Sequence, residues 1–211
     1  MDFRPDGSLV LDRALSMSLV SEEAVSHEIV ETARLVRLTL SGDSAAFEQI
    51  VIRHETRVMN LAARILGSRD DAPDAAQEVF LRAFKYLHRL DLQKPIEPWL
   101  MRITVNVCRD AARSRQRCGA QIDGETPEAI DRAADPYDGL AQKEERLLLR
   151  RALETLPEKE RLAVLLRDVE GLPTSEVAAI LNSSGTTVRS QISRGRVRLK
   201  DAIDRMMGGR L

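Results

Sequence analysis

Apolar residues recur along the chain at intervals of three and four, and this spacing predicts helices. From Glu31 the pattern predicts a short helix ending near Gly42, then a long one that begins at Asp43 or Ser44 and ends at Gly67. A third helix follows "SRDDAPD" and carries "AAQEVFLRAFKYLHRL". The prolines of "DLQKPIEP" then interrupt the chain, and "WLMRITVNVCRDAARSRQRC" resumes as a helix with a basic end. We expect the core to include the following residues: Phe47, Ile50, Val51, His54, Val58, Leu61, Ala62, Ile65, Val79, Phe80, Ala83 and Phe84.

The second half of the chain predicts four more helices after a break. Residues 119–141, "GAQIDGETPEAIDRAADPYDGLA", combine Gly, Pro and acids, which favours a flexible acidic linker. The helical pattern resumes with "QKEERLLLRRALETL", and Pro157 starts the next helix, which ends at Gly171. A short helix, "PTSEVAAIL", the turn "NSS" and the basic helix "TTVRSQISRGRVRLK" follow. We therefore predict an all-α protein with an extension at 1–30 and two small helical domains at 31–118 and 142–211.

The composition fits a soluble helical protein. Hydrophobic residues make up 43% of the chain, charged residues 31% and aromatic residues only 3%. No apolar run approaches the roughly 20 residues of a membrane span, and the acidic N-terminus lacks the basic start of a signal peptide. We expect a cytoplasmic protein without a membrane span.

The sequence gives no indication of catalysis or of a metal. Cys108 and Cys118 have no histidine at zinc-finger spacing, so we expect structural or surface thiols, with a redox role as the alternative. We find no glycine-rich phosphate loop and no nucleophile with a plausible base. The prediction is a protein that is not an enzyme, with no catalytic residue, no cofactor and no metal site.

The formal net charge of −1 conceals an alternating pattern along the chain. Residues 1–45 carry a balance of −4, residues 46–118 of +4, residues 119–145 of −6 and residues 146–211 of +5. Two basic modules separated by an acidic connector are expected if two surfaces meet a polyanion and the connector avoids it.

The last two predicted helices have the proportions of a helix-turn-helix, whose second helix enters the major groove of DNA. Asn182 lies in the turn, where it tolerates the left-handed conformation. The face opposite the core centres on Ser190 and holds side chains able to reach base edges: Thr187, Ser190, Gln191, Ser193 and Arg194. Cations suited to phosphates flank this face: Arg189, Arg196, Arg198 and Lys200. The alternative is a basic amphipathic helix on the protein surface or on anionic lipid.

Two stretches of the chain resemble the sigma factors of bacterial RNA polymerase. "LPEKERLAVLLRDVEGLPTSEVAAILNSSGTTVRSQISRGRVRLK" is similar to their fourth-region domain. "DDAPDAAQEVFLRAFKYLHRL" followed by "PWLMRITVNVCRDAARSRQR" is similar to their second-region domain. The order of the two, with no third-region domain between them, resembles the extracytoplasmic-function group over residues 31–206. This resemblance implies a protein that binds core polymerase, recognises both promoter elements, melts the upstream one and initiates transcription of a specific regulon.

The resemblance also implies roles for residues of the first domain. Asp74, Gln77 and Glu78, with Phe80, would bind the polymerase through its largest-subunit coiled coil, the flap being the other polymerase contact. Trp99 and the loop from Asp91 to Glu97 would lie beside the melted strand. The DNA-binding face of the helix after the loop would consist of Arg102, Asn106, Arg109, Arg113 and Arg115. Taken without the resemblance, these could be a solvated polar face, a core tryptophan and a solvated basic face.

The resemblance further implies an anti-sigma factor as partner, and the acidic extension could act in cis as a mimic of DNA. Three departures from the family pattern leave the promoter sequence open. Pro173 replaces the usual Ser or Thr cap, which leaves Thr174 as the alternative cap, and Gln191 replaces a common Arg. Ile96 and Pro98 replace the usual aromatic and small polar residue before the Trp. The competing function is a conventional regulator that binds duplex DNA as a symmetric dimer.

Overall fold

The structure is a computed structural model that describes residues 22–117 and 140–208. Every element assigned in these two ranges is a helix, which confirms the all-α prediction. The chain divides into two compact units, and each is described by itself. None of the helices in the described ranges combines the length and apolar character needed to cross a bilayer. Most of the predicted extension, nearly all of the predicted linker and Cys118 lie outside the described residues.

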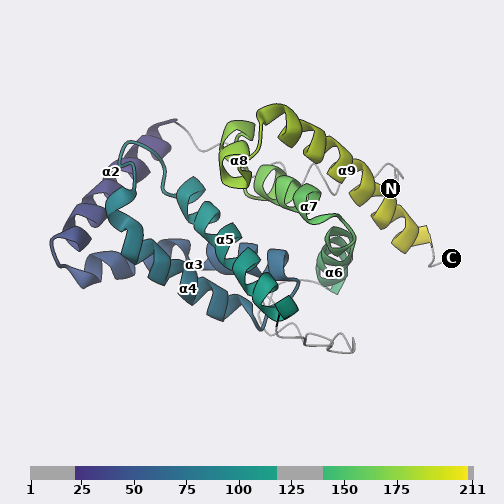
Figure 1. Cartoon of the computed structure of the whole chain (residues 1–211), viewed down its shortest axis with the longest axis horizontal. Helices are drawn as coiled ribbons and strands as arrows, with labels where there is room; N and C mark the ends of the chain where they lie inside the picture. The colour runs from purple at the N-terminus through teal and green to yellow at the C-terminus, as the bar shows by residue number, and fades with distance from the viewer. Residues whose placement is uncertain (1–21, 118–139, 209–211) are drawn as a thin grey trace. The chain divides into compact units, whose positions relative to one another are not determined.

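Four helices and a short 3-10 turn make up the first unit. They are α2 (Glu22–Leu40), α3 (Ser44–Leu66), α4 (Ala72–Tyr86), η1 (Leu87–Arg89) and α5 (Glu97–Arg117). Helix α3 packs against α2, α4 and α5 (Figure 1). Helix α2 starts before the predicted position at Glu31, inside the predicted extension. Its first turns mix acids with Ala24, Val25, Ile29 and Val30, which gives only weak apolar periodicity.

The boundaries of α3 follow from its end residues, as predicted. The Asp43 side chain accepts hydrogen bonds from the backbone amides of Ala45 at 2.9 Å and Ala46 at 3.3 Å. These amides belong to the first turn, where no backbone acceptor exists. At the other end Gly67 has φ 69°, a left-handed conformation that glycine adopts without steric cost.

The core of the first unit contains most of the predicted residues, but Phe47 and Val51 are only half-buried and Phe84 is exposed. Val58 and Leu61 are fully buried, and Phe80 is 8% exposed. Phe84 was expected in the core and is 53% exposed, so that prediction is wrong. The buried stripe of α4 ends at Ala83, and Phe84 lies at its edge, where its ring meets the edge of Phe47 with centroids 5.0 Å apart.

The second unit consists of α6 (Leu140–Glu154), α7 (Glu158–Val164), the π-helical turn η2 (Leu165–Val169), α8 (Thr174–Leu181) and α9 (Gly185–Gly208). Helix α9, yellow in Figure 1, packs against α6, α7 and α8. Gly171 has φ 75° and ends the α7–η2 segment, as expected. The π-helical turn has no signal in the sequence pattern.

The turn between α8 and α9 has the expected backbone. Asn182 adopts the left-handed conformation, with φ 50° and ψ 53°. The start of α8 differs from expectation. Pro173 occupies the cap position in an extended conformation, with no side-chain hydrogen bond to the helix. Thr174 is already the first helical residue and therefore does not cap α8, because a capping residue must have a non-helical backbone.

Candidate nucleic-acid interface

The start of α9 is fixed by hydrogen bonds from the turn. The Ser184 Oγ accepts a hydrogen bond from the Thr187 backbone amide at 3.1 Å and lies 2.8 Å from the Thr187 hydroxyl. The Ser184 carbonyl accepts from the Val188 amide at 2.9 Å. A serine cap of this kind satisfies amides of the first turn, which otherwise have no partner. The turn therefore sets the rotation at which α9 presents its exposed face.

The burial pattern along α9 agrees with the predicted face, except at Gln191. The buried residues are Val188, Gln191, Ile192, Gly195, Leu199 and Ala202. The predicted contact residues that are exposed are Thr187, Arg189, Ser190, Ser193, Arg194, Arg196 and Arg198. Gln191 is only 7% exposed, and its buried Oε1 has no hydrogen-bond partner. The prediction that Gln191 reads bases is therefore wrong for this conformation. Because α9 packs against three helices, its buried face is wider than a single apolar stripe.

Helix α7 comes close to α9 at Gly195. A Cβ added there would lie 2.7 Å from Val164 Cγ2 and 3.3 Å from the carbonyl oxygen of Glu160. Only glycine permits this spacing without displacement of α7. Helix α7 therefore supports the middle of α9 from the side opposite Ser190.

Two acidic residues of the α7–η2 segment pair with arginines of α9. Asp168 accepts hydrogen bonds from Arg196 Nε at 2.9 Å and Nη2 at 2.5 Å. Glu160 lies 3.6 Å from Arg194 Nε and 3.3 Å from Arg198 Nη1. The hydrogen bond with Asp168 raises the pKa of Arg196. Sequence reasoning missed both acids, because the residues of each pair are separated by about thirty positions in the chain.

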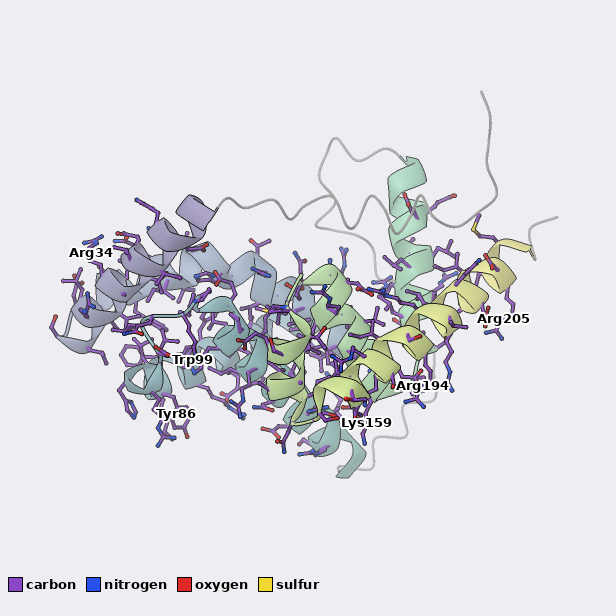
Figure 2. The ribbon with its side chains drawn as sticks, turned by 90° about the horizontal axis from the view of Figure 1, so that it is seen from above. Arg34, Tyr86, Trp99, Lys159, Arg194 and Arg205 are labelled. Carbon is purple, nitrogen blue, oxygen red and sulfur yellow. The ribbon has the colours of Figure 1, made fainter. Side chains whose placement is uncertain are left out.

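The α5 face predicted to contact DNA exists in the first unit. Trp99 is half-buried in the first turn of α5 (Figure 2). Arg102, Asn106 and Arg113 are exposed, and Arg109 is partly exposed. Arg113 lies 3.8 Å from Asp110 in the preceding turn.

Arg115 has a carboxylate partner outside α5. Its Nη2 lies 2.6 Å from Asp71, just before α4. The ion pair links α5 to the start of α4, where both side chains remain about half-exposed. Arg115 therefore has a role in the packing of the first unit besides its predicted contact with DNA.

The loop before Trp99 is anchored at both ends. Asp91 accepts a hydrogen bond from the Gln93 amide at 3.1 Å, which lowers the pKa of Asp91, and lies 3.2 Å from Lys94 Nζ. At the other end Ile96 is 1% exposed. An anchored loop is a suitable wall for a pocket that receives an unstacked base.

A polar cluster, made of the buried Glu97 and His54 and the exposed Glu28, joins the start of α5 to α3 and α2. Glu97 is 9% exposed and lies 3.8 Å from the Nδ1 of His54. Burial lowers the pKa of His54. Burial, followed by a hydrogen bond with Glu97, raises the pKa of Glu28 on α2. Glu28 belongs to the part of α2 that the sequence did not predict as a helix, and it contacts the start of the helix that carries Trp99.

The predicted polymerase-binding cluster lies on α4. Asp74 and Gln77 are exposed, and Glu78 is partly exposed. Arg82 Nε lies 2.6 Å from Glu78, and its Nη1 lies 2.8 Å from Asp110 on α5, so Arg82 joins the two helices. A groove of about 410 Å³ runs between them. Phe80 is buried and supports this surface from inside, which corrects its assignment as a contact residue.

Cys108 is buried, and burial raises the pKa of its thiol to about 12. A neutral, buried thiol is unreactive, which agrees with the structural role that was predicted. Within the described ranges, no group of His, Cys, Asp and Glu side chains could hold a metal ion.

Comparison with known proteins decides the family. The family model for Sigma-70 region 2 matches residues 50–118, and that for Sigma-70 region 4 matches residues 146–199. The ECF RNA polymerase sigma-E factor of Escherichia coli is 31% identical over 178 residues, which cover 81% of this chain and 91% of that protein. The chain belongs to the extracytoplasmic-function sigma factors. It is therefore an alternative sigma factor for transcription initiation, and α8 with the first part of α9 lies in the region-4 match.

Other members of the family show the same relationship. The ECF RNA polymerase sigma factor SigE of Mycolicibacterium smegmatis is 39% identical over 168 residues, covering 76% of this sigma factor and 64% of that one. Among solved structures, CnrH in complex with the cytosolic domain of CnrY matches with a TM-score of 0.60 and 26% identity, over 84% of this chain and 97% of CnrH. The RpoE sigma factor of Bartonella quintana shares the fold, with a TM-score of 0.64 at 23% identity over 75% of this chain and 96% of RpoE.

Proposed function

We propose that this sigma factor binds core RNA polymerase, recognises both promoter elements and directs transcription of its own set of promoters. The observation that carries the proposal is the exposed face of α9, where short polar side chains and arginines follow a capped helix start. Side chains of this kind can contact base edges and phosphates when the helix lies in a major groove. The basic face of α5, in a separate unit, supports a second contact with the promoter.

Arg194 provides the most direct test of base reading by α9. Its side chain is 62% exposed, and its neighbour Ser193 is exposed as well. If Arg194 contacts a base, Arg194→Ala weakens binding to the promoter duplex by about 1–3 kcal/mol and relaxes sequence preference at one position. An equal loss on random duplex would show a phosphate contact instead. Lys200→Ala is the matched control, because this exposed cation on α9 is expected to contact phosphate.

In the first unit, we propose that Trp99 and the anchored loop receive bases of the melted strand. Unstacking costs a few kcal/mol per base, which stacking on an aromatic side chain can offset. Trp99→Ala should therefore reduce open-complex formation, followed by permanganate reactivity of unpaired thymines, while closed-complex binding remains. Unchanged permanganate reactivity would assign Trp99 to the core of the unit.

We propose that the exposed acid and amide of α4 contact the polymerase. Asp74→Asn and Gln77→Ala should weaken the association with core enzyme, measured by competition with another sigma factor. Glu48→Gln, at an exposed position of α3, makes a charge change equal to that of Asp74→Asn. Weakening by Glu48→Gln to the same extent would show a general effect of charge and would oppose the proposal.

An anti-sigma partner is part of the same proposal. CnrH, 26% identical to this chain, was solved in complex with the cytosolic domain of CnrY. A partner that covers the polymerase-binding or DNA-binding surface would restrain a sigma factor that otherwise competes for polymerase. Pull-down with the wild-type chain and with Asp74→Asn, followed by a transcription assay, tests whether a captured protein inhibits initiation through this surface.

We also propose that the acidic N-terminal extension, with a balance of −4 over residues 1–45, can act on the basic surfaces of the same chain. Deletion of residues 1–21 leaves α2 intact but removes a balance of only −1, so the test combines it with Glu22→Gln and Glu23→Gln. The truncated chain should bind DNA more tightly than the full chain. Equal DNA binding and equal transcription would remove the proposal.

The decisive experiment is run-off transcription from a promoter library with purified core polymerase, with and without this protein. We expect transcripts from a subset of templates that share two sequence elements, only when the sigma factor is present. Failure to associate with core enzyme, combined with tight binding of palindromic duplex as a dimer, would favour a conventional regulator and overturn the proposal.

A further inference from the structure

The cations of α9 are not all available to a ligand. From Thr186 to Lys200 the helix carries five cations and no acid. Three of them have carboxylate partners from the neighbouring α7–η2 segment, which were not apparent from the sequence. Arg196 pairs with Asp168, and both Arg194 and Arg198 lie within 4 Å of Glu160.

The two acids and the three arginines differ in burial. The side chains of Glu160 and Asp168 are only 9% and 10% exposed, whereas the three arginines are 48–62% exposed. A carboxylate that is largely removed from water needs a positive partner. An exposed guanidinium can move to a different anion without leaving solvent. The acids are therefore fixed, and the arginines can exchange them for another negative group.

The two acids hold their arginines with different geometry. Glu160 Oε2 lies 3.3 Å from Arg198 Nη1, but this buried oxygen makes no aligned hydrogen bond. Asp168 occupies the Nε and Nη2 edge of Arg196, which is the edge best suited to bidentate binding of a phosphate. DNA phosphate must displace Asp168 to bind Arg196 in this way.

We propose that Glu160 and Asp168 are specificity-determining residues that compete with DNA phosphates for the arginines of α9. The inference rests on the proposed DNA contact of α9. The acids reduce phosphate binding, which is common to duplex of every sequence, and leave the exposed Ser190 and Ser193 free to contact bases. Phosphate contacts are the main source of affinity for other sequences, whereas the promoter element also has base contacts. The acids therefore weaken binding to other sequences more than binding to the promoter element.

The salt dependence of binding distinguishes this role from a purely structural one. Binding to DNA of random sequence is essentially phosphate contact with release of counterions, and each contact adds about 0.9 to the slope of log K against log salt. One additional contact therefore makes the affinity loss between 50 and 200 mM salt about 3.5-fold larger. If the acids only positioned the arginines for DNA, the opposite result would follow. Removal of an acid would then weaken DNA binding.

The experiment uses the full chain with Asp168→Asn and Glu160→Gln, and a labelled duplex of random sequence, with fluorescence anisotropy at several salt concentrations. Glu154→Gln is the matched control, since this exposed acid of α6 gives the same change in charge. We expect both variants to bind random duplex about 3-fold to 10-fold more tightly at 50 mM salt, with a slope steeper by about 0.9 per released arginine. The control should bind as the wild type does.

A second substitution assigns the gain to the arginine. Asp168→Asn combined with Arg196→Gln should return binding to the level of Arg196→Gln alone. Circular dichroism of each variant shows whether the helices are retained. If Glu160→Gln unfolds, the DNA affinity and salt slope of Asp168→Asn alone test the inference. Wild-type affinity and slope in Asp168→Asn, or weaker binding, would overturn the inference. Absence of any preference of the wild type for promoter duplex would instead count against the proposed function.

Discussion

Gly195→Ala tests the close approach of α7 and α9 that positions the recognition helix. In an ordinary helix this change would stabilise by about 1 kcal/mol, because alanine has the higher helix propensity. Here the new Cβ would lie 2.7 Å from Val164 Cγ2, where ordinary contact begins near 3.4 Å. Val164 is 3% exposed and, as a β-branched residue, has a stiff χ1.

The second neighbour of the added Cβ cannot rotate away. It is the backbone carbonyl of Glu160, at 3.3 Å, so relief requires a shift of α7 itself. Overpacking typically costs about 1–3 kcal/mol, and two held neighbours place this case near the upper end. After subtraction of the propensity gain we expect a loss of about 2 kcal/mol, or about 8–16 °C in Tm for a domain of this size.

The assay can separate the two units because Trp99 is the only tryptophan of the chain. Its fluorescence follows unfolding of the first unit, whereas circular dichroism follows both. Gly195→Ala should shift the circular dichroism transition in denaturant and leave the tryptophan transition unchanged. Gly185→Ala is the control, since its Cβ would meet nothing nearer than 3.9 Å. A Gly195→Ala chain as stable as the wild type would refute the close approach.

Three further changes concern the first unit. Asp43→Ala should lower its free energy of unfolding by about 1 kcal/mol, seen in the Trp99 transition, because first-turn amides of α3 lose their acceptor. In a Cys118→Ser background, Cys108 should resist a thiol reagent at pH 8 until denaturant is added, because its pKa is raised to about 12. His54 has a lowered pKa, so the unfolded chain binds its proton first and stability should fall as pH drops below 6.5. His54→Gln should lose this dependence between pH 7.5 and 6.

Features that depend on neighbouring residues in the chain could be predicted from the sequence. Asp43 at the start of α3, Gly67 at its end and left-handed Asn182 in the turn follow from local backbone chemistry. The apolar periodicity likewise identified the buried side of α9, including Gly195 and Leu199. Each of these predictions concerns contacts within one helix or across one turn.

Features that depend on packing between helices could not be predicted. Gln191 is buried because α9 contacts three helices, and Phe84 is exposed because the packing of α4 ends at Ala83. The pairing of Arg196 with Asp168 joins residues 28 positions apart. Charge counts along the chain identified α9 as basic but could not show which of its cations are already partnered.

The corrected face of α9 limits how a promoter can be read. With Gln191 buried, the exposed side chains in the first two turns that carry hydrogen-bonding groups are the short Thr186, Thr187 and Ser190 and one long cation, Arg189. Residues at the N-terminal end of a recognition helix enter the groove most deeply, and a short side chain reaches a base edge only if the helix backbone comes close. Arg194, Arg196 and Arg198, which have acidic partners in the α7–η2 segment, follow in the later turns. We therefore expect sequence preference from the start of α9 and from Arg194, through few base pairs, and affinity from the cations that follow Arg194.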